Sequence, residues 1–67
     1  MLRHPVNSSR MLSVGWENGI MEIEFNNHAI YQYYNVSEAQ YQAFVASPSL
    51  GQELQHFQKL HPYDRIS

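Results

Sequence analysis

The stretch that decides the fold is residues 11–25, which read MLSVGWENGIMEIEF. Apolar residues alternate with other residues on both sides of Asn18-Gly19, a pattern typical of two strands. Asn-Gly is the strongest short hairpin signal, because both central residues of a type I′ turn need positive φ. A two-residue turn predicts three facing pairs, which are Trp16 with Met21, Val14 with Ile23 and Leu12 with Phe25. These apolar side chains then share one face, and Glu22 and Glu24 share the other, which we call the glutamate face.

A third strand is expected over residues 29–34, after a turn at residues 26–28. A two-residue turn there places Tyr31 and Tyr33 on the glutamate face. A three-residue loop places both tyrosines on the core face, because a shift of one residue turns every side chain to the other face. The sequence slightly favours the two-residue turn, and three antiparallel strands in simple order make a meander.

Two short helices are expected after the third strand. Ser37 and Gln40 form a capping box, which predicts a helix over residues 38–46. Four apolar residues then recur at helical spacing and predict the core-facing stripe of a second helix, namely Leu50, Leu54, Phe57 and Leu60. Pro62 ends this helix and leaves a short C-terminal tail. The fold class is therefore α+β over residues 1–67 as a single domain, with a three-stranded antiparallel β-meander followed by two short C-terminal helices.

Composition excludes several classes of protein. The chain has 67 residues, of which 43% are hydrophobic, so it contains enough apolar material for one small core. It has no cysteine, which excludes disulfides and thiolate metal sites. No apolar run approaches the ~18–20 residues of a membrane span, and residues 1–10 lack the apolar centre of a signal peptide. We therefore expect a cytoplasmic protein that does not bind membranes.

Several short segments, in this order and spacing, are similar to a known family. They are Val6-Asn7-Ser8-Ser9, the strand from Met11 to Trp16, Met21-Glu22-Ile23-Glu24-Phe25, Tyr31-Gln32-Tyr33, Ser49-Leu50-Gly51 and residues 61–66. The chain resembles the KTSC domain, which is named for the C-terminus of some lysyl-tRNA synthetases and also occurs as small stand-alone proteins. Tyr31-Gln32-Tyr33 matches the Tyr-x-Tyr motif of that family. The resemblance implies RNA binding as an expectation. It also indicates that His28 stands where glycine is usual, so that turn is strained or one residue longer.

Seven residues are candidates for binding a ligand or partner, and they fall into three groups: Ser8, Ser9 and Arg10; Tyr31 and Tyr33; Ser49 and Gly51. Paired tyrosines on a strand can stack bases, or they can fill a core beneath a helix. The serine–arginine segment can hold an anion, or the hydroxyls can serve a local turn. The third group can bind an anion at a helix N-terminus, or it can simply cap the helix.

Charge argues against strong nucleic-acid binding. The formal net charge is −2, the wrong sign for a tight phosphate binder. Glutamates on the same face as the tyrosines would repel phosphates. The basic residues are Arg3, Arg10, Lys59 and Arg65, and they make one small patch only if the N-terminal arm and the C-terminal tail converge.

No catalytic or metal-binding pattern is present. The four histidines lack ligand spacing, and neither a nucleophile motif nor a phosphate loop occurs. We therefore expect no enzyme activity, no metal and no cofactor. The sequence favours a small non-catalytic binding module for RNA or a nucleotide. The alternative is a protein-interaction module of a bacterial or phage protein that docks on and modulates a larger partner, through the tyrosine-bearing face or through the free edge of the third strand. The oligomeric state stays open.

Overall fold

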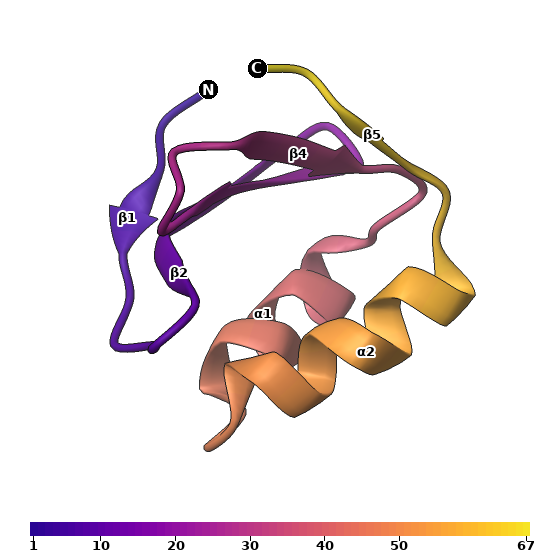
Figure 1. The fold of residues 1–67 in the computed structure, drawn as a ribbon. Coiled ribbons are helices and arrows are strands. Elements are labelled where there is room, and N and C mark those ends of the chain that lie inside the picture. The colour runs from indigo at the N-terminus through magenta and orange to yellow at the C-terminus, as the bar shows by residue number, and fades with distance from the viewer.

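Five antiparallel strands form one sheet in the order β1-β2-β3-β4-β5, and two helices cover one of its faces (Figure 1). The computed structural model describes residues 1–67. The elements, in chain order, are β1 (His4–Pro5), β2 (Met11–Glu17), β3 (Ile20–Phe25), β4 (Ile30–Tyr33), α1 (Glu38–Ala46), α2 (Leu50–Leu60) and β5 (Tyr63–Arg65). The α+β class is confirmed. The expected three strands are too few, and the helices lie between β4 and β5 rather than at the end of the chain.

The β2–β3 hairpin closes at the Asn-Gly turn, with φ of 51° at Asn18 and 83° at Gly19. Val14 faces Ile23 in the predicted register. The predicted pair of Leu12 with Phe25 is wrong, because a bulge adds one residue to β2 and Met11 faces Phe25 instead. The residues that follow Leu12 keep the predicted alternation, while Leu12 itself is 39% exposed.

The β3–β4 turn is the three-residue alternative. The Phe25 amide donates to the Ala29 carbonyl at 2.9 Å, and His28 between them has φ of 67°. A turn followed by one left-handed residue is a common way to build such a loop. The added residue pairs Tyr31 with Ile23 and Tyr33 with Met21. The expectation that the tyrosines share the glutamate face is therefore wrong, and both side chains lie on the face that α1 and α2 cover.

Both helices occur where the sequence predicts them. At the start of α1, the Gln40 amide donates to Ser37 Oγ at 3.1 Å, and the Ser37 amide donates to Gln40 Oε1 at 2.9 Å, which completes the capping box. In α2 the predicted stripe is correct except for Leu60, which is 72% exposed because it lies in the last turn, where the chain leaves toward β5. His61 is buried at this end and lies against Phe57.

The C-terminal segment is a strand rather than a tail. In β5, Tyr63 pairs with Tyr33 and Arg65 pairs with Tyr31. The third strand of the predicted meander, β4, is therefore an interior strand, and the expectation that it offers a free edge is wrong. β1 and β5 are the edges of the sheet. With two and three residues, they are too short to show a periodic pattern.

The core lies between the sheet and the helices. Its largest fully buried side chains are Tyr33, Phe44, Met11, Met21, Ile23, Val14 and Val36. Three buried residues of α2 complete it from below, namely Leu50, Leu54 and Phe57. The arrangement leaves the glutamate face uncovered by helices, so the two faces of the sheet have different chemistry.

Candidate functional site

An open groove of about 660 Å³ lies between α2 and the strands β4 and β5. We call it the tyrosine groove. Its lining residues are Ser9, Arg10, Phe25, Asn26, Asn27, Ala29, Tyr31, Tyr33, Leu54, Gln55, Gln58 and Tyr63. None of them is acidic, and Arg10 is the single formally charged residue among them. The groove therefore combines aromatic rings, side-chain amides and one cation.

Four of the seven predicted site residues line this groove, which are Ser9, Arg10, Tyr31 and Tyr33. The strand register brings the tyrosines to the covered face, and Arg10, which immediately precedes β2, lines the same groove. Ser8, Ser49 and Gly51 do not line the groove. The Arg10 side chain nevertheless approaches Gly51, since its Cδ lies 3.6 Å from where a Cβ on that glycine would stand.

The aromatic rings form a continuous series across the groove. Phe25 meets Tyr31 edge-to-face at a centroid distance of 5.4 Å. Tyr63 lies 6.1 Å from Tyr31 and 5.3 Å from Tyr33. These distances are typical of favourable aromatic pairs. Tyr63 is 44% exposed, so part of its ring is free to contact a ligand.

Tyr63 is the residue that sequence reasoning missed. It follows Pro62 in a segment without apolar periodicity, and nothing local signals a strand there. The one available signal was that residues 61–66 belong to the segments shared with the KTSC domain. Its place beside Tyr33 depends on the pairing of β5 with β4.

The Tyr33 hydroxyl is buried and has no hydrogen-bond partner. Burial raises the pKa of Tyr33, and the neighbouring Gln58 amide opposes this effect only in part. Gln58 lies close to the hydroxyl but does not meet hydrogen-bond geometry. An unpaired buried hydroxyl costs about 1–3 kcal/mol. Such a group is unusual in a native protein.

Arg10 is exposed and takes part in no ion pair. Its backbone is well held: the amide donates to Ser8 Oγ at 3.1 Å, and the carbonyl accepts from the Asn26 amide at 2.9 Å. These bonds fix the base of the side chain at the rim of the tyrosine groove. They also show that the Ser8 hydroxyl serves the local turn, as the simpler interpretation of this segment predicts.

The third predicted group, Ser49 and Gly51, lines neither of the two grooves of the structure. Ser49 occupies the N-cap position of α2, but its side chain makes no capping hydrogen bond, so the expected side-chain cap is wrong. Its amide donates instead to Ser47 Oγ at 3.2 Å. A Cβ on Gly51 would meet Arg10 only at ordinary contact distance. Close packing therefore does not require glycine at this position.

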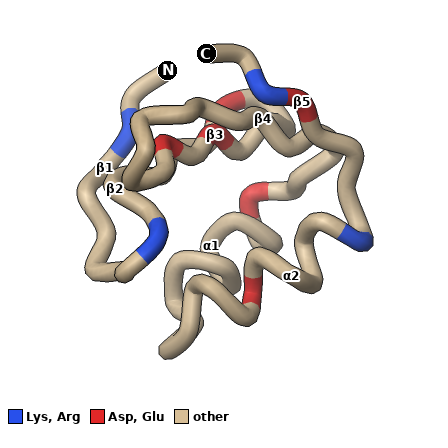
Figure 2. The backbone as a smooth tube through the Cα atoms, in the orientation of Figure 1, with Lys and Arg blue, Asp and Glu red and all other residues tan.

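The glutamate face has its own ion pair on the opposite side of the sheet. Arg3 contacts Glu22 and lies 3.7 Å from Glu24, and the Gln32 amide donates to Glu22 at 2.9 Å. Glu22 is 6% exposed, so its carboxylate is buried beneath Arg3. The basic residues do not converge, and Figure 2 shows them at well-separated places on the chain. The convergence that a basic patch would need therefore does not occur, and Arg3 in addition pairs with two glutamates.

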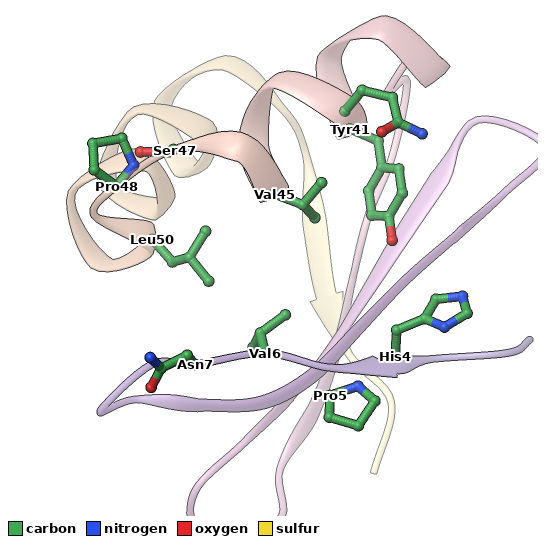
Figure 3. Close-up of a pocket in the computed structure, with 10 residues that line it drawn as sticks. His4, Pro5, Val6, Asn7, Tyr41, Val45, Ser47, Pro48 and Leu50 are labelled. Atoms are coloured by element: carbon green, nitrogen blue, oxygen red, sulfur yellow. The ribbon is translucent and has the colours of Figure 1, made fainter.

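A second groove, of about 570 Å³, lies between β1 and α1 (Figure 3). Tyr41 and Val45 point from the helix toward the N-terminal segment, where Val6 and His4 lie. None of the seven predicted residues lines it. It contains neither a lysine nor an arginine, so we take the tyrosine groove as the candidate site.

No three histidine, aspartate or glutamate side chains gather in a way that could hold a metal ion. No helix in the structure has the length and apolar character needed to cross a membrane.

Comparison with known proteins places this chain in a family. The model of the KTSC domain matches residues 7–60, which is most of the chain. The chain belongs to the KTSC domain family. The crystal structure of KTSC domain protein YPO2434 from Yersinia pestis is similar to it, with a TM-score of 0.91 and 33% sequence identity over 98% of this chain and 97% of that chain. No curated protein matches the chain.

The resemblance seen in the sequence is thus confirmed. The part that matches the KTSC domain model includes Arg10, Tyr31 and Tyr33, whereas Tyr63 lies beyond it. The Yersinia protein covers nearly the whole chain, so its similarity extends to the strand that carries Tyr63. The tyrosine groove is therefore built from the KTSC core plus a C-terminal strand that completes its wall.

Proposed function

We infer that this KTSC domain is a small non-catalytic binding module that takes RNA or a nucleotide in the tyrosine groove. The observation that supports this function best is the composition of the groove. Aromatic rings that can stack on bases lie beside an arginine without an ion-pair partner, and no acidic side chain lines the surface. Stacking of a base on an aromatic side chain contributes about 1–3 kcal/mol.

The strand register removes the main electrostatic objection to this function. If the tyrosines shared a face with Glu22 and Glu24, the carboxylates would repel a phosphate. In the structure the tyrosines face α2, and both glutamates lie on the other side of the sheet next to Arg3. A phosphate at the groove is therefore close to Arg10 and separated from the carboxylates by the sheet.

An amide NMR titration with a mixed-sequence short single-stranded RNA tests the proposal. At low salt we expect saturable shifts at Arg10, Tyr31 and Tyr63, and weaker binding at physiological salt, because phosphate contacts depend on ionic strength. A flat titration on the folded protein would overturn the proposed function.

The substitution Tyr63→Ser gives a sharper form of this experiment. Tyr63 is partly exposed, so we expect about 10-fold weaker RNA binding from lost stacking with the fold intact. Tyr34→Ser is the matched control. Tyr34 lies outside the groove, and its hydroxyl donates to Gln32 Oε1 at 3.3 Å. Both variants should keep a cooperative unfolding transition, and only Tyr63→Ser should weaken RNA binding.

One observation favours a second function, docking on a larger protein. The outer edge of β5 is unpaired, and three large apolar side chains beside it are exposed, namely Leu60, Tyr63 and Ile66. A free edge with neighbouring apolar side chains suits strand addition by a partner. If docking is the function, Leu60→Asp would abolish binding to a purified protein partner and Arg10→Gln would not. The opposite pattern would assign binding to the groove.

A further inference from the structure

The tyrosine groove presents one cation to a ligand. Arg3 contacts Glu22 on the opposite face of the sheet. Arg65 donates through Nε to the Ser67 carbonyl at 3.0 Å and does not line the groove. Lys59 does not line it either. A nucleic-acid strand that lies along a binding surface needs several cations to neutralise successive phosphates. The groove supplies the charge for one phosphate only.

An uncharged polar group lies buried in the wall of the groove. The Tyr33 hydroxyl is fully buried, has no partner, and belongs to a residue that lines the groove. Gln58 lies next to this hydroxyl, and its side chain projects from an exposed position of α2. A ligand that reaches this hydroxyl requires the exposed Gln58 side chain to move aside. A planar base edge carries the donors and acceptors that this hydroxyl lacks.

The spacing of these groups suits a single nucleotide. Arg10 immediately precedes β2, whereas Tyr31 lies on β4, two strands away. The two residues are also offset along the strands by three positions, because Tyr31 faces Ile23 while the Arg10 carbonyl accepts from the Asn26 amide. Two strand spacings and three residues place the backbones about 14 Å apart, and both side chains line the groove, so the span within it is on the scale of one nucleotide. The ring of Tyr63 lies next to both Tyr31 and Tyr33, at centroid distances of 6.1 and 5.3 Å.

We propose that the tyrosine groove binds one nucleoside monophosphate unit, with its phosphate at Arg10, its base against Tyr31 and Tyr63, and a polar group of the base edge at the Tyr33 hydroxyl. This inference rests on the proposed function and restricts it. The unit has two sources with the same chemistry, a free mononucleotide and the phosphorylated end of an RNA. Tyr33 determines which base is preferred, because its hydroxyl is the buried polar group that a base must satisfy.

Calorimetric titrations with the four ribonucleoside monophosphates and the four matching nucleosides test the phosphate site. We expect each monophosphate to bind about 10-fold tighter than its nucleoside. The logarithm of the association constant should fall with the logarithm of salt concentration with a slope of about −0.7 to −0.9, as one phosphate contact predicts. Arg10→Gln should lower the affinity for each monophosphate to the affinity for its nucleoside. Arg65→Gln is the matched control and should change nothing.

The variant Tyr33→Phe tests the base site, because it keeps the ring in the core and removes only the hydroxyl. We expect the preference among the four monophosphates to disappear and the tightest one to lose about 10-fold in affinity. The thermal unfolding midpoint should stay the same or rise, since an unpaired buried hydroxyl is removed. Unchanged base preference in this folded variant would overturn the role of Tyr33.

Oligonucleotides distinguish a free mononucleotide from a phosphorylated RNA end as the ligand. They also distinguish a single-nucleotide site from a longer RNA-binding surface. Trinucleotides with a 5′-phosphate, a 3′-phosphate or neither are compared with the best monophosphate. If one phosphorylated trinucleotide binds as tightly as the best monophosphate, the ligand is an RNA end. If all three trinucleotides bind more weakly than that monophosphate, the ligand is a free nucleotide. A 12-nucleotide RNA that binds more than 100-fold tighter, with a salt slope steeper than −3, would overturn the single-nucleotide site but keep RNA binding. Absence of binding by every nucleotide and RNA would overturn both.

Discussion

Two buried features show how much single residues constrain this small sheet. Gly15 in β2 faces the backbone of the N-terminal segment, and a Cβ on it would stand 2.2 Å from the Leu2 carbonyl oxygen. The other feature is Tyr33, whose ring fills the core while its hydroxyl finds no partner. In the first case space restricts the residue, and in the second a polar atom has been buried without compensation.

At Gly15 the structure predicts a loss of stability on substitution. Gly15→Ala would force the N-terminal segment away from β2, because a backbone atom cannot yield as a flexible side chain can, and we expect about 1–3 kcal/mol of destabilisation. Gly51→Ala is the matched control. Its Cβ would meet the Arg10 side chain at ordinary distance, so a gain of about 0.5–1 kcal/mol is expected from helix propensity. Urea denaturation measures both, and equal effects would contradict the packing argument.

The burial of Tyr33 makes the stability of the folded protein depend on alkaline pH. Burial raises its pKa in the folded protein above the ordinary value of 10.0. The folded state therefore keeps this proton when the unfolded state releases it, so the stability contributed by neutral Tyr33 is complete below pH 10 and is lost as pH rises through the folded pKa. Denaturation midpoints between pH 8 and pH 11 should fall, and Tyr33→Phe should reduce the fall. Burial also raises the pKa of Tyr41, so a slope should remain in Tyr33→Phe.

Among the structural elements, the β3–β4 loop has the largest effect on the binding surface. Its three residues set the register that turns Tyr31 and Tyr33 toward α2. The loop needs a left-handed residue, and His28 fills that position with φ of 67°. Left-handed geometry is unfavourable for a residue with a Cβ, so this element is held by the pairing of the strands on each side.

The loop geometry predicts that His28→Gly stabilises the protein. Glycine adopts the left-handed conformation without a steric penalty, and we expect a gain of about 1 kcal/mol in the free energy of unfolding. His28 is exposed, and its contact with Glu24 at 3.2 Å is on the surface, so little is lost with the side chain. Asn27→Gly serves as the control and should not stabilise. A destabilised His28→Gly variant would contradict the expected strain.

The whole molecule is a sheet whose centre is well supported and whose edges are weak. β2, β3 and β4 contribute Val14, Ile23 and Tyr33 to the core, each fully buried. The residues of β1 and β5 are all exposed, and these strands contain only two and three residues. Edge strands with little buried surface open more readily than the centre of a sheet.

Amide hydrogen exchange tests this difference. We expect the slowest exchange at the hydrogen-bonded amides of β3 and faster exchange at β5 and at the Ile66 amide just after it, which donates to the Ile30 carbonyl at 2.8 Å. Because Tyr63 belongs to β5, binding of a ligand in the tyrosine groove should slow exchange in this strand. Uniform protection across all five strands would show that the edges unfold only with the whole molecule.

Local chemistry accounts for the elements that the sequence predicted correctly. The Asn-Gly turn, the Ser37–Gln40 capping box and the stripe from Leu50 to Phe57 each act over a few neighbouring residues, so they are visible without a tertiary structure. The KTSC resemblance likewise depended on segments that stay in order along the chain. The hairpin, both helices and the family were therefore determined by the sequence itself.

Tertiary structure decided the features that depend on pairing between distant segments. The third residue of the β3–β4 loop determines which face of the sheet carries Tyr31 and Tyr33. The two possible loop lengths differ too little in local energy for the sequence to indicate which one forms. The strand at Tyr63 forms only because β4 offers an edge, and Arg3 is removed from the candidate basic patch only because Glu22 lies beneath it. The tyrosine groove is a product of these long-range contacts, which is why its members, but not its shape, could be found in the sequence.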